Sequence, residues 1–171
     1  YWNHLEWKDT LSKEFCTERQ RQYVQTMELK GPYTPQVIIN GRHDIPGSRR
    51  GWIKGTIADD LKEIRISKIG LALSDNQLNI SLPQIDKGTY QVLLFPFGYN
   101  HAEMIKAGEN EGKLLQYTNP VENIIPLGSW NGKAKSLSYN VKDYTDAHGF
   151  AVIVHNFSLT GSIVAASQVK R

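Results

Sequence analysis

The chain has 171 residues, of which 40% are hydrophobic and 22% charged, so it can bury one good core or two small ones. Its 20 basic and 17 acidic residues give a formal charge of +3 and are scattered without a basic run, which argues against nucleic acid as a partner. No apolar stretch approaches the roughly 20 residues needed to span a bilayer, and the start of the chain lacks the pattern of a signal peptide.

The chain opens on Tyr1 and Trp2 without an initiator methionine, so we expect it to be a fragment or a processed form. Its single cysteine, Cys16, excludes an intrachain disulfide and a zinc site built from several thiolates. Two interpretations of Cys16 stand side by side. One is a reactive or intermolecular thiol near cationic residues. The other, which we favour, is an inert small apolar residue on a helix.

The first part of the chain predicts a helix, a hairpin and a second helix. Helical periodicity covers residues 10–29 and ends at Lys30-Gly31. An apolar strand, an Asn-Gly turn and a short return strand follow in "PQVIINGRHDI". The second helix is predicted to begin at Ser48 and to run to about residue 65, with one apolar face made of Ile53, Ile57, Leu61 and Ile64.

From residue 67 onward the apolar period changes from the helical 3.6 to the 2 of a strand. A hairpin is predicted on either side of "SDNQ", and six apolar residues should face one core as cross-strand neighbours: Ile69, Leu71, Leu73, Leu78, Ile80 and Leu82. Six further strand-like runs are 89–95, 113–119, 122–128, 135–141, 150–157 and 162–169. This density of short strands predicts an antiparallel sandwich or barrel-like module, with 98–113 as its longest irregular segment.

A Thr-Pro pair, Thr34-Pro35, stands directly before the apolar strand of the first hairpin. Proline cannot donate to a β-ladder and is normally found at sheet edges, whereas "QVIIN" has the β-branched content of a buried strand. A cis peptide bond reconciles the two observations, and we predict one here. A trans proline at a strand start, without a role in ligand binding, is the alternative.

Several segments carry a resemblance to a known family. "YWNHLEWKD", "FCTERQRQY" and "YTPQVIINGR" near the start, with "NEGKLLQYTNPV" and "LGSWNG" further on, resemble secreted bacterial thioredoxin-like proteins known only as domain of unknown function twelve twenty-three. The resemblance implies an incomplete α/β thioredoxin-like portion at residues 1–66, followed by a β-rich, sandwich-like antiparallel portion at 67–171. It also implies a periplasmic or secreted location. The family's Cys-x-x-Cys segment is absent from this chain, and Cys16 does not lie where that pair belongs.

Two functions follow from the resemblance. The first is descent from a thiol-disulfide oxidoreductase, with this chain inactive by itself because its redox motif is missing. The second is a non-catalytic extracytoplasmic module that binds a peptide or protein partner. In both, a cradle around the proline binds an extended peptide, and the Thr34 backbone lies near Trp2 and Asn3. The implied binding residues are Thr34, Pro35, Tyr33, Trp2, Asn3 and Trp7.

Other chemistry has little support in the sequence. The five histidines show no ligand spacing on a shared element, so no metal is predicted. The glycines form no phosphate loop, and no cofactor is implied. No nucleophile elbow or pair of catalytic carboxylates is present. The aromatic residues Tyr1, Trp2 and Trp7 have a second interpretation, as core residues, and the sequence indicates no oligomeric state.

Overall fold

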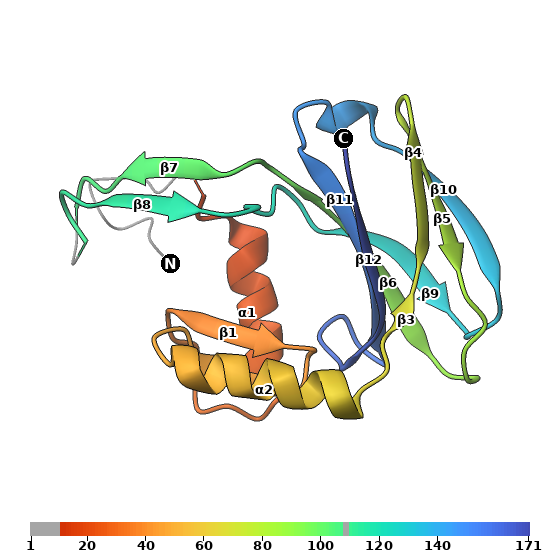
Figure 1. Ribbon diagram of the computed structural model, residues 1–171, viewed down its shortest axis with the longest axis horizontal. Helices are drawn as coiled ribbons and strands as arrows, with labels where there is room; N and C mark the ends of the chain where they lie inside the picture. Colours follow the sequence, from red (N-terminus) through yellow and green to blue (C-terminus); the bar gives the residue numbers. More distant parts are fainter. Residues whose placement is uncertain (1–10, 108–109) are drawn as a thin grey trace.

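The computed structural model describes residues 11–107 and 110–171 (Figure 1). The first part holds the two helices of the described chain, α1 (Glu14–Thr26) and α2 (Arg50–Glu63), with the strands β1 (Gln36–Ile39) and β2 (His43–Pro46) between them. The remaining strands are β3 (Ser67–Lys68), β4 (Gly70–Ser74), β5 (Gln77–Leu82), β6 (Tyr90–Phe97), β7 (His101–Met104), β8 (Leu114–Tyr117), β9 (Ile125–Trp130), β10 (Lys135–Asn140), β11 (Gly149–Asn156) and β12 (Ile163–Lys170). A short 3-10 helix, η1, spans Lys142–Tyr144.

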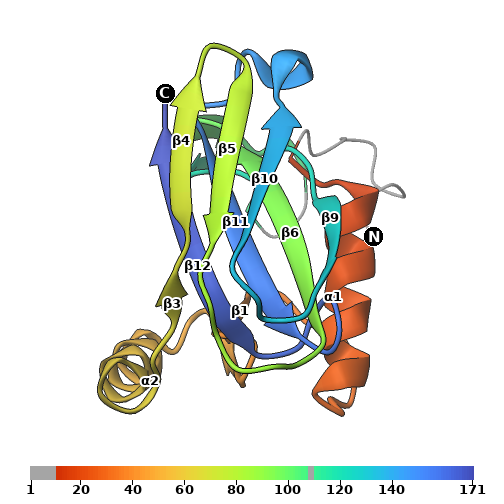
Figure 2. The same cartoon turned by 90° about the vertical axis from the view of Figure 1, so that its right-hand side faces the viewer.

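The main core lies between two sheets. A five-stranded sheet in the order β3-β12-β11-β6-β9 faces a three-stranded sheet in the order β10-β5-β4 (Figure 2). All pairs are antiparallel except β12 with β3. The side chains that alternate inward from the two sheets form one cluster, which includes Leu78, Ile80, Leu94, Phe150 and Val152. Such burial of alternate residues from two facing sheets is what stabilises a β-sandwich.

The hairpin predicted on either side of "SDNQ" is confirmed. It is β4 and β5, in which Leu71 pairs with Ile80 and Leu73 with Leu78. Ile69 is buried next to β4, and the six predicted residues pack in or against the one core cluster.

The first part of the chain forms three small layers. Figure 2 shows β1 lying between α2 and α1. The hairpin turn uses Asn40 and Gly41, both with positive φ (51° and 65°), and a Cβ at position 41 would collide with the Gly161 carbonyl oxygen. The Asn40 carbonyl accepts a hydrogen bond from the Ile163 amide at 2.9 Å, which joins the hairpin to β12.

A hairpin arm, β7–β8, projects away from the sandwich (Figure 1). Its first strand lies within 98–113, so the prediction of an irregular segment there is wrong for residues 101–104. "HAEM" has no clear period-2 pattern, and these residues become a strand because β8 supplies the partner, with His101 opposite Tyr117 and Met104 opposite Leu114.

The predicted α/β thioredoxin-like portion is wrong. The order of helix, hairpin and helix is present, but β1 and β2 form a two-stranded antiparallel sheet, and the described fold is β-rich with two helices and several small antiparallel sheets. Local periodicity predicts each element correctly but does not determine how many strands join a sheet, and the α/β assignment depended on that number. The β-rich, antiparallel character predicted for 67–171 agrees with the observed strands.

Candidate functional site

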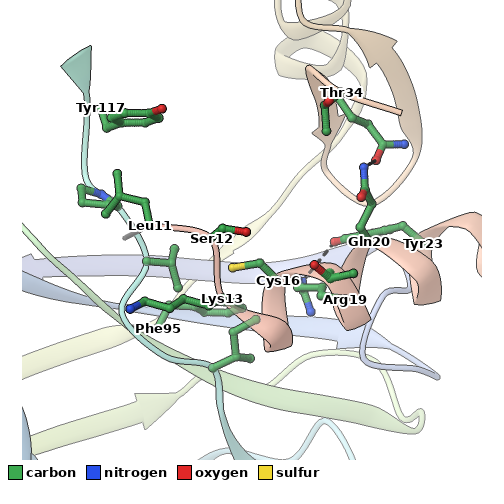
Figure 3. Close-up of a pocket in the computed structure, with 15 residues that line it drawn as sticks. Leu11, Ser12, Lys13, Cys16, Arg19, Gln20, Tyr23, Thr34, Phe95 and Tyr117 are labelled. Carbon is green, nitrogen blue, oxygen red and sulfur yellow. Dashed lines mark hydrogen bonds between the residues drawn. The ribbon is translucent and has the colours of Figure 1, made fainter. Parts of the chain in front are cut away.

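A pocket of about 520 Å³ lies where the first part of the chain meets the sandwich (Figure 3). One wall is α1 with the residues before it. The second is the start of β1, and the third is β6 with the segment between β8 and β9. The lining residues are Leu11, Ser12, Lys13, Cys16, Thr17, Arg19, Gln20, Tyr23, Thr34, Gln36, Phe95, Tyr117, Pro120, Val121 and Ile124.

The wall formed by residues 120–124 is mostly apolar and is fixed by backbone hydrogen bonds to β6. The Gly98 amide donates to the Pro120 carbonyl at 2.8 Å, and the Glu122 amide donates to the Pro96 carbonyl at 2.9 Å. Val121 forms a bridge with Phe97 between these bonds. This wall is therefore positioned by the end of β6, a strand of the five-stranded sheet, rather than by a free loop.

Arg19 fixes the α1 wall to the sandwich. Its guanidinium donates to the Leu159 carbonyl at 2.8 Å and to the Tyr23 hydroxyl at 3.1 Å. It also lies over the rings of Tyr23 and Phe95, at 5.1 and 5.2 Å from the ring centroids. The charged guanidinium of Arg19 therefore interacts with these protein groups and stabilises the α1 wall of the pocket.

His155, fully buried on β11, completes this connection. Its Nδ1 lies 2.6 Å from the Gly161 carbonyl oxygen, and its Nε2 lies 3.0 Å from Nη2 of Arg19. Because the carbonyl can only accept, Nδ1 carries the proton and Nε2 accepts from Arg19. Burial, with a smaller contribution from the Arg19 charge, lowers the pKa of His155 to about 4, so the ring is neutral at pH 7.

Cys16 lies on the α1 side of the pocket, between Tyr117 and Thr34 (Figure 3). Partial desolvation raises the pKa of its thiol, and the charges of Arg19 and Lys13 offset this only in part. A thiol with a raised pKa forms little thiolate at neutral pH, and the thiolate is the nucleophile. The residue is exposed, and its raised pKa is what the interpretation of Cys16 as an inert residue on a helix expects.

The Thr34-Pro35 peptide bond is cis, as predicted. Thr34 lines the pocket, whereas Pro35 and Tyr33 do not. The Tyr33 hydroxyl donates to Oδ1 of Asp44 at 2.7 Å; desolvation and this hydrogen bond raise the pKa of Tyr33 to about 12. The Tyr33 carbonyl accepts from Nε2 of Gln20 at 2.8 Å. Tyr33 therefore does not line the pocket itself but holds Gln20, which lines it together with Gln36.

The other predicted binding residues, Trp2, Asn3 and Trp7, lie outside the described residues. Sequence reasoning missed the far wall of the pocket, which includes Phe95, Val121 and Ile124. Phe95 and Ile124 are apolar members of strand-like runs, Val121 lies between two such runs, and no local signal separates the three from core residues. Among the described residues, no group of three or more His, Cys, Asp or Glu side chains could hold a metal ion, and no helix is long and apolar enough to cross a membrane.

Residues 1–155 match a known protein family, DUF1223, whose description is 'protein of unknown function'. The chain belongs to this family. The match spans most of the chain, and it confirms the resemblance found in the sequence as far as the family itself. No curated protein matches the chain.

A comparison with solved structures finds the same fold in another protein. The crystal structure of a protein from Agrobacterium tumefaciens has 24% sequence identity and a TM-score of 0.82, over 99% of this chain and 76% of that one. The Agrobacterium protein thus shares the fold described above. A superoxide reductase from Giardia intestinalis has 14% identity and a TM-score of 0.31, over 63% of this chain and 99% of that one. A TM-score this low does not indicate a shared fold.

Proposed function

We propose that this DUF1223 protein is a non-catalytic module that binds an extended segment of another polypeptide, with an apolar side chain of that segment in the pocket at α1. The observation that carries this function is the composition of the pocket. Phe95, Val121 and Ile124 offer apolar surface on one side, and Gln20, Thr34 and Gln36 offer polar groups on the other. Ligand-binding pockets in general combine apolar area with a few fixed polar groups in this way, and an extended segment can place one side chain in such a pocket.

A thiol-disulfide oxidoreductase ancestry, implied by the resemblance, has less support. The raised pKa of Cys16 disfavours its thiolate, and the sequence holds no second cysteine to resolve a mixed disulfide. We retain an extracytoplasmic location, periplasmic or secreted, as part of the proposed function; it rests on the resemblance alone.

Binding of a defined peptide tests this function. The probe is a synthetic peptide, Glu-Thr-Val-Phe-Val-Thr-Glu with blocked ends, whose central phenylalanine fits the apolar wall and whose glutamates keep it soluble. Isothermal titration should show saturable binding that weakens about tenfold when the phenylalanine becomes alanine, because burying such a side chain is worth about 1.5–3 kcal/mol.

Two tryptophan variants on α1 localise the binding. Cys16→Trp fills the pocket and should abolish binding. Glu18→Trp places the same bulk on an exposed part of α1 that does not line the pocket, and should bind normally. Equal binding by the two variants, or no binding by the parent chain, would rule out the pocket as the site.

A further inference from the structure

Another pocket, of about 620 Å³, lies at the far end of α1, between that helix and the sandwich. One wall is α1, a second is formed by β6 and β9, and the third is the loop between β11 and β12, residues 157–162. Figure 2 shows α1 lying beside β6 and β9. Three glutamines from the first two walls, Gln22, Gln25 and Gln91, line it, and we call it the glutamine pocket. Its volume falls within the roughly 300–1,000 Å³ of small-molecule sites.

The loop wall of the glutamine pocket is fixed by polar contacts to α1. The Thr160 hydroxyl lies 2.7 Å from the Thr26 hydroxyl, and Thr160 is only 2% exposed. The Leu159 carbonyl accepts from the Arg19 guanidinium at 2.8 Å. Thr26, Leu159 and Thr160 all line the pocket. These contacts hold the wall in place before a ligand binds, and such preorganisation lowers the entropic cost of binding.

Phe157, on the same wall, is an exposed aromatic residue on a strained backbone. It is 73% exposed, and its φ is 61°, in the left-handed region that glycine adopts without steric cost. Its amide donates to the Thr89 carbonyl at 2.8 Å, which holds this conformation. An exposed side chain gains little from burial to offset the strain. Because strained residues cluster at ligand-binding sites, the position of Phe157 indicates a role in binding.

The polar groups of the glutamine pocket are uncharged. Its described lining residues include no acidic residue, basic residue or histidine, although 22% of the chain is charged. Nε2 of Gln22 donates to Oε1 of Glu18 at 3.4 Å, which leaves the Gln22 amide oxygen as an acceptor. The Ser158 hydroxyl accepts from the Thr160 amide at 3.4 Å, which leaves its own proton to donate. Neutral donors and acceptors of this kind favour a neutral ligand with hydroxyl groups over a phosphate or a carboxylate.

We propose that the glutamine pocket binds a neutral oligosaccharide whose ring hydroxyls are equatorial, with one sugar ring stacked on Phe157. In such a pyranose the C–H bonds cover both faces, and the hydroxyls lie around the rim. The face of an aromatic ring carries partial negative charge and attracts C–H groups. The rim hydroxyls hydrogen-bond to the amides of Gln22, Gln25 and Gln91. This site is separate from the peptide-binding pocket, so the inference does not depend on the proposed function.

A polypeptide segment, whether of a partner or of the protein itself, is a poorer fit for the glutamine pocket. An extended segment gains affinity from unpaired backbone groups, but backbone groups of the loop are bonded within the protein. The Asn156 amide donates to the Ser162 carbonyl at 2.8 Å, and the Gly161 amide donates to the Ser158 carbonyl at 3.3 Å. On β9 the lining residue is Pro126, which has no amide to donate. The pocket therefore offers side-chain groups and an aromatic face, which suit a sugar.

Titration of the full chain with two uncharged trisaccharides tests the proposal. Cellotriose and triacetylchitotriose both have equatorial substituents, and they distinguish a glucan from an N-acetylglucosamine glycan as the source of the ring. At least one should bind saturably in isothermal titration, whereas sorbitol, which has hydroxyls but no ring, should not bind. Saturable binding of neither trisaccharide, or equal binding of sorbitol, would overturn the proposal.

Two alanine variants localise the binding. Phe157→Ala should weaken trisaccharide binding at least tenfold. Tyr99→Ala removes another exposed aromatic side chain, from a residue that is 67% exposed and does not line the pocket, and should change the affinity less than twofold. Equal affinities in the two variants would overturn the glutamine pocket as the site.

Two further variants separate a role of Phe157 in binding from a role in folding. Phe157→Gly removes both the ring and the strain, so its urea midpoint should be unchanged or higher, while its trisaccharide affinity should fall at least tenfold. Phe157→Trp keeps an aromatic face and should bind within threefold of the parent chain. A lower midpoint for Phe157→Gly with unchanged trisaccharide affinity would assign the ring to folding and overturn the proposal.

Discussion

Nη2 of Arg19 lies 3.0 Å from Nε2 of His155, which connects the middle of α1 to the central strand β11 of the sandwich. The same guanidinium reaches the Leu159 carbonyl, and Thr26 and Thr160 hydroxyls lie 2.7 Å apart at the far end of the helix. The pocket wall is therefore held to the sandwich by polar contacts along α1, so its geometry depends on them.

Replacing Arg19 by alanine should lower the free energy of unfolding by about 3 kcal/mol. The change removes the partner of buried His155 Nε2 and of the Leu159 carbonyl, and a lost hydrogen bond from a charged donor costs about 1.5–3 kcal/mol. Arg21→Ala, on an exposed position of the same helix, is the matched control and should cost little. Urea unfolding measures both, and equal costs would show that the Arg19 contacts contribute nothing.

Stability should fall as the pH falls from about 6.5 to about 4. The pKa of His155 is about 4 in the folded chain and about 6.5 when unfolded. Between these values the unfolded state binds the extra proton, so protonation favours unfolding by up to about 3 kcal/mol. Urea unfolding at a series of pH values should show this slope in the parent chain and a flatter one in His155→Asn, which has no ring to titrate. The same slope in both would assign it to other groups.

Replacing Asp60 by alanine should loosen α2. Its buried carboxylate accepts from Asn40 Nδ2 at 2.6 Å and from His43 Nε2 at 3.0 Å, and losing both bonds should cost about 1–3 kcal/mol. The neighbouring Asp59 pairs with Lys62 at the surface, where both side chains are about 70% exposed, so Asp59→Ala should cost close to nothing. Thermal unfolding compares the two variants. A loss of stability no greater for Asp60→Ala than for Asp59→Ala would contradict the role of the Asp60 carboxylate in holding α2.

The chain should show no disulfide reductase turnover in an insulin-reduction assay. One thiolate must attack and a second thiol must resolve the mixed disulfide, and this sequence offers Cys16 alone. Cys16→Ser should leave the background rate unchanged. Robust turnover that disappears in that variant would make a monothiol mechanism the leading hypothesis instead.

The sequence predicted elements whose signals are local. The pairing of Leu71 with Ile80 followed from strict alternation on both sides of a turn. The α/β assignment was wrong because helix, hairpin and helix are each local patterns, whereas the number of strands in a sheet depends on distant parts of the chain.

The pocket shows the same division between local and distant signals. Its near wall includes Thr34, which the sequence singled out. Its far wall includes Val121, which lies 87 residues further along the chain and meets α1 only through the pairing of residue 121 with Phe97. The role of Arg19, on the α1 wall, was likewise not predicted. A charged residue on a helix normally faces solvent, and the contact of Arg19 with His155 depends on a residue 136 positions away in the sequence.

Mapping the amide chemical shifts of the labelled chain during titration with the phenylalanine peptide tests the central claim most directly. If the pocket at α1 binds the peptide, the largest shifts should fall on Cys16, Gln20, Thr34 and Val121, four pocket residues that come from three separate parts of the chain. The chemical shifts of the amides in β4 and β10, on the opposite sheet of the sandwich, should not change. Shifts centred on that sheet, or no shifts at saturating peptide, would contradict the pocket as the functional site.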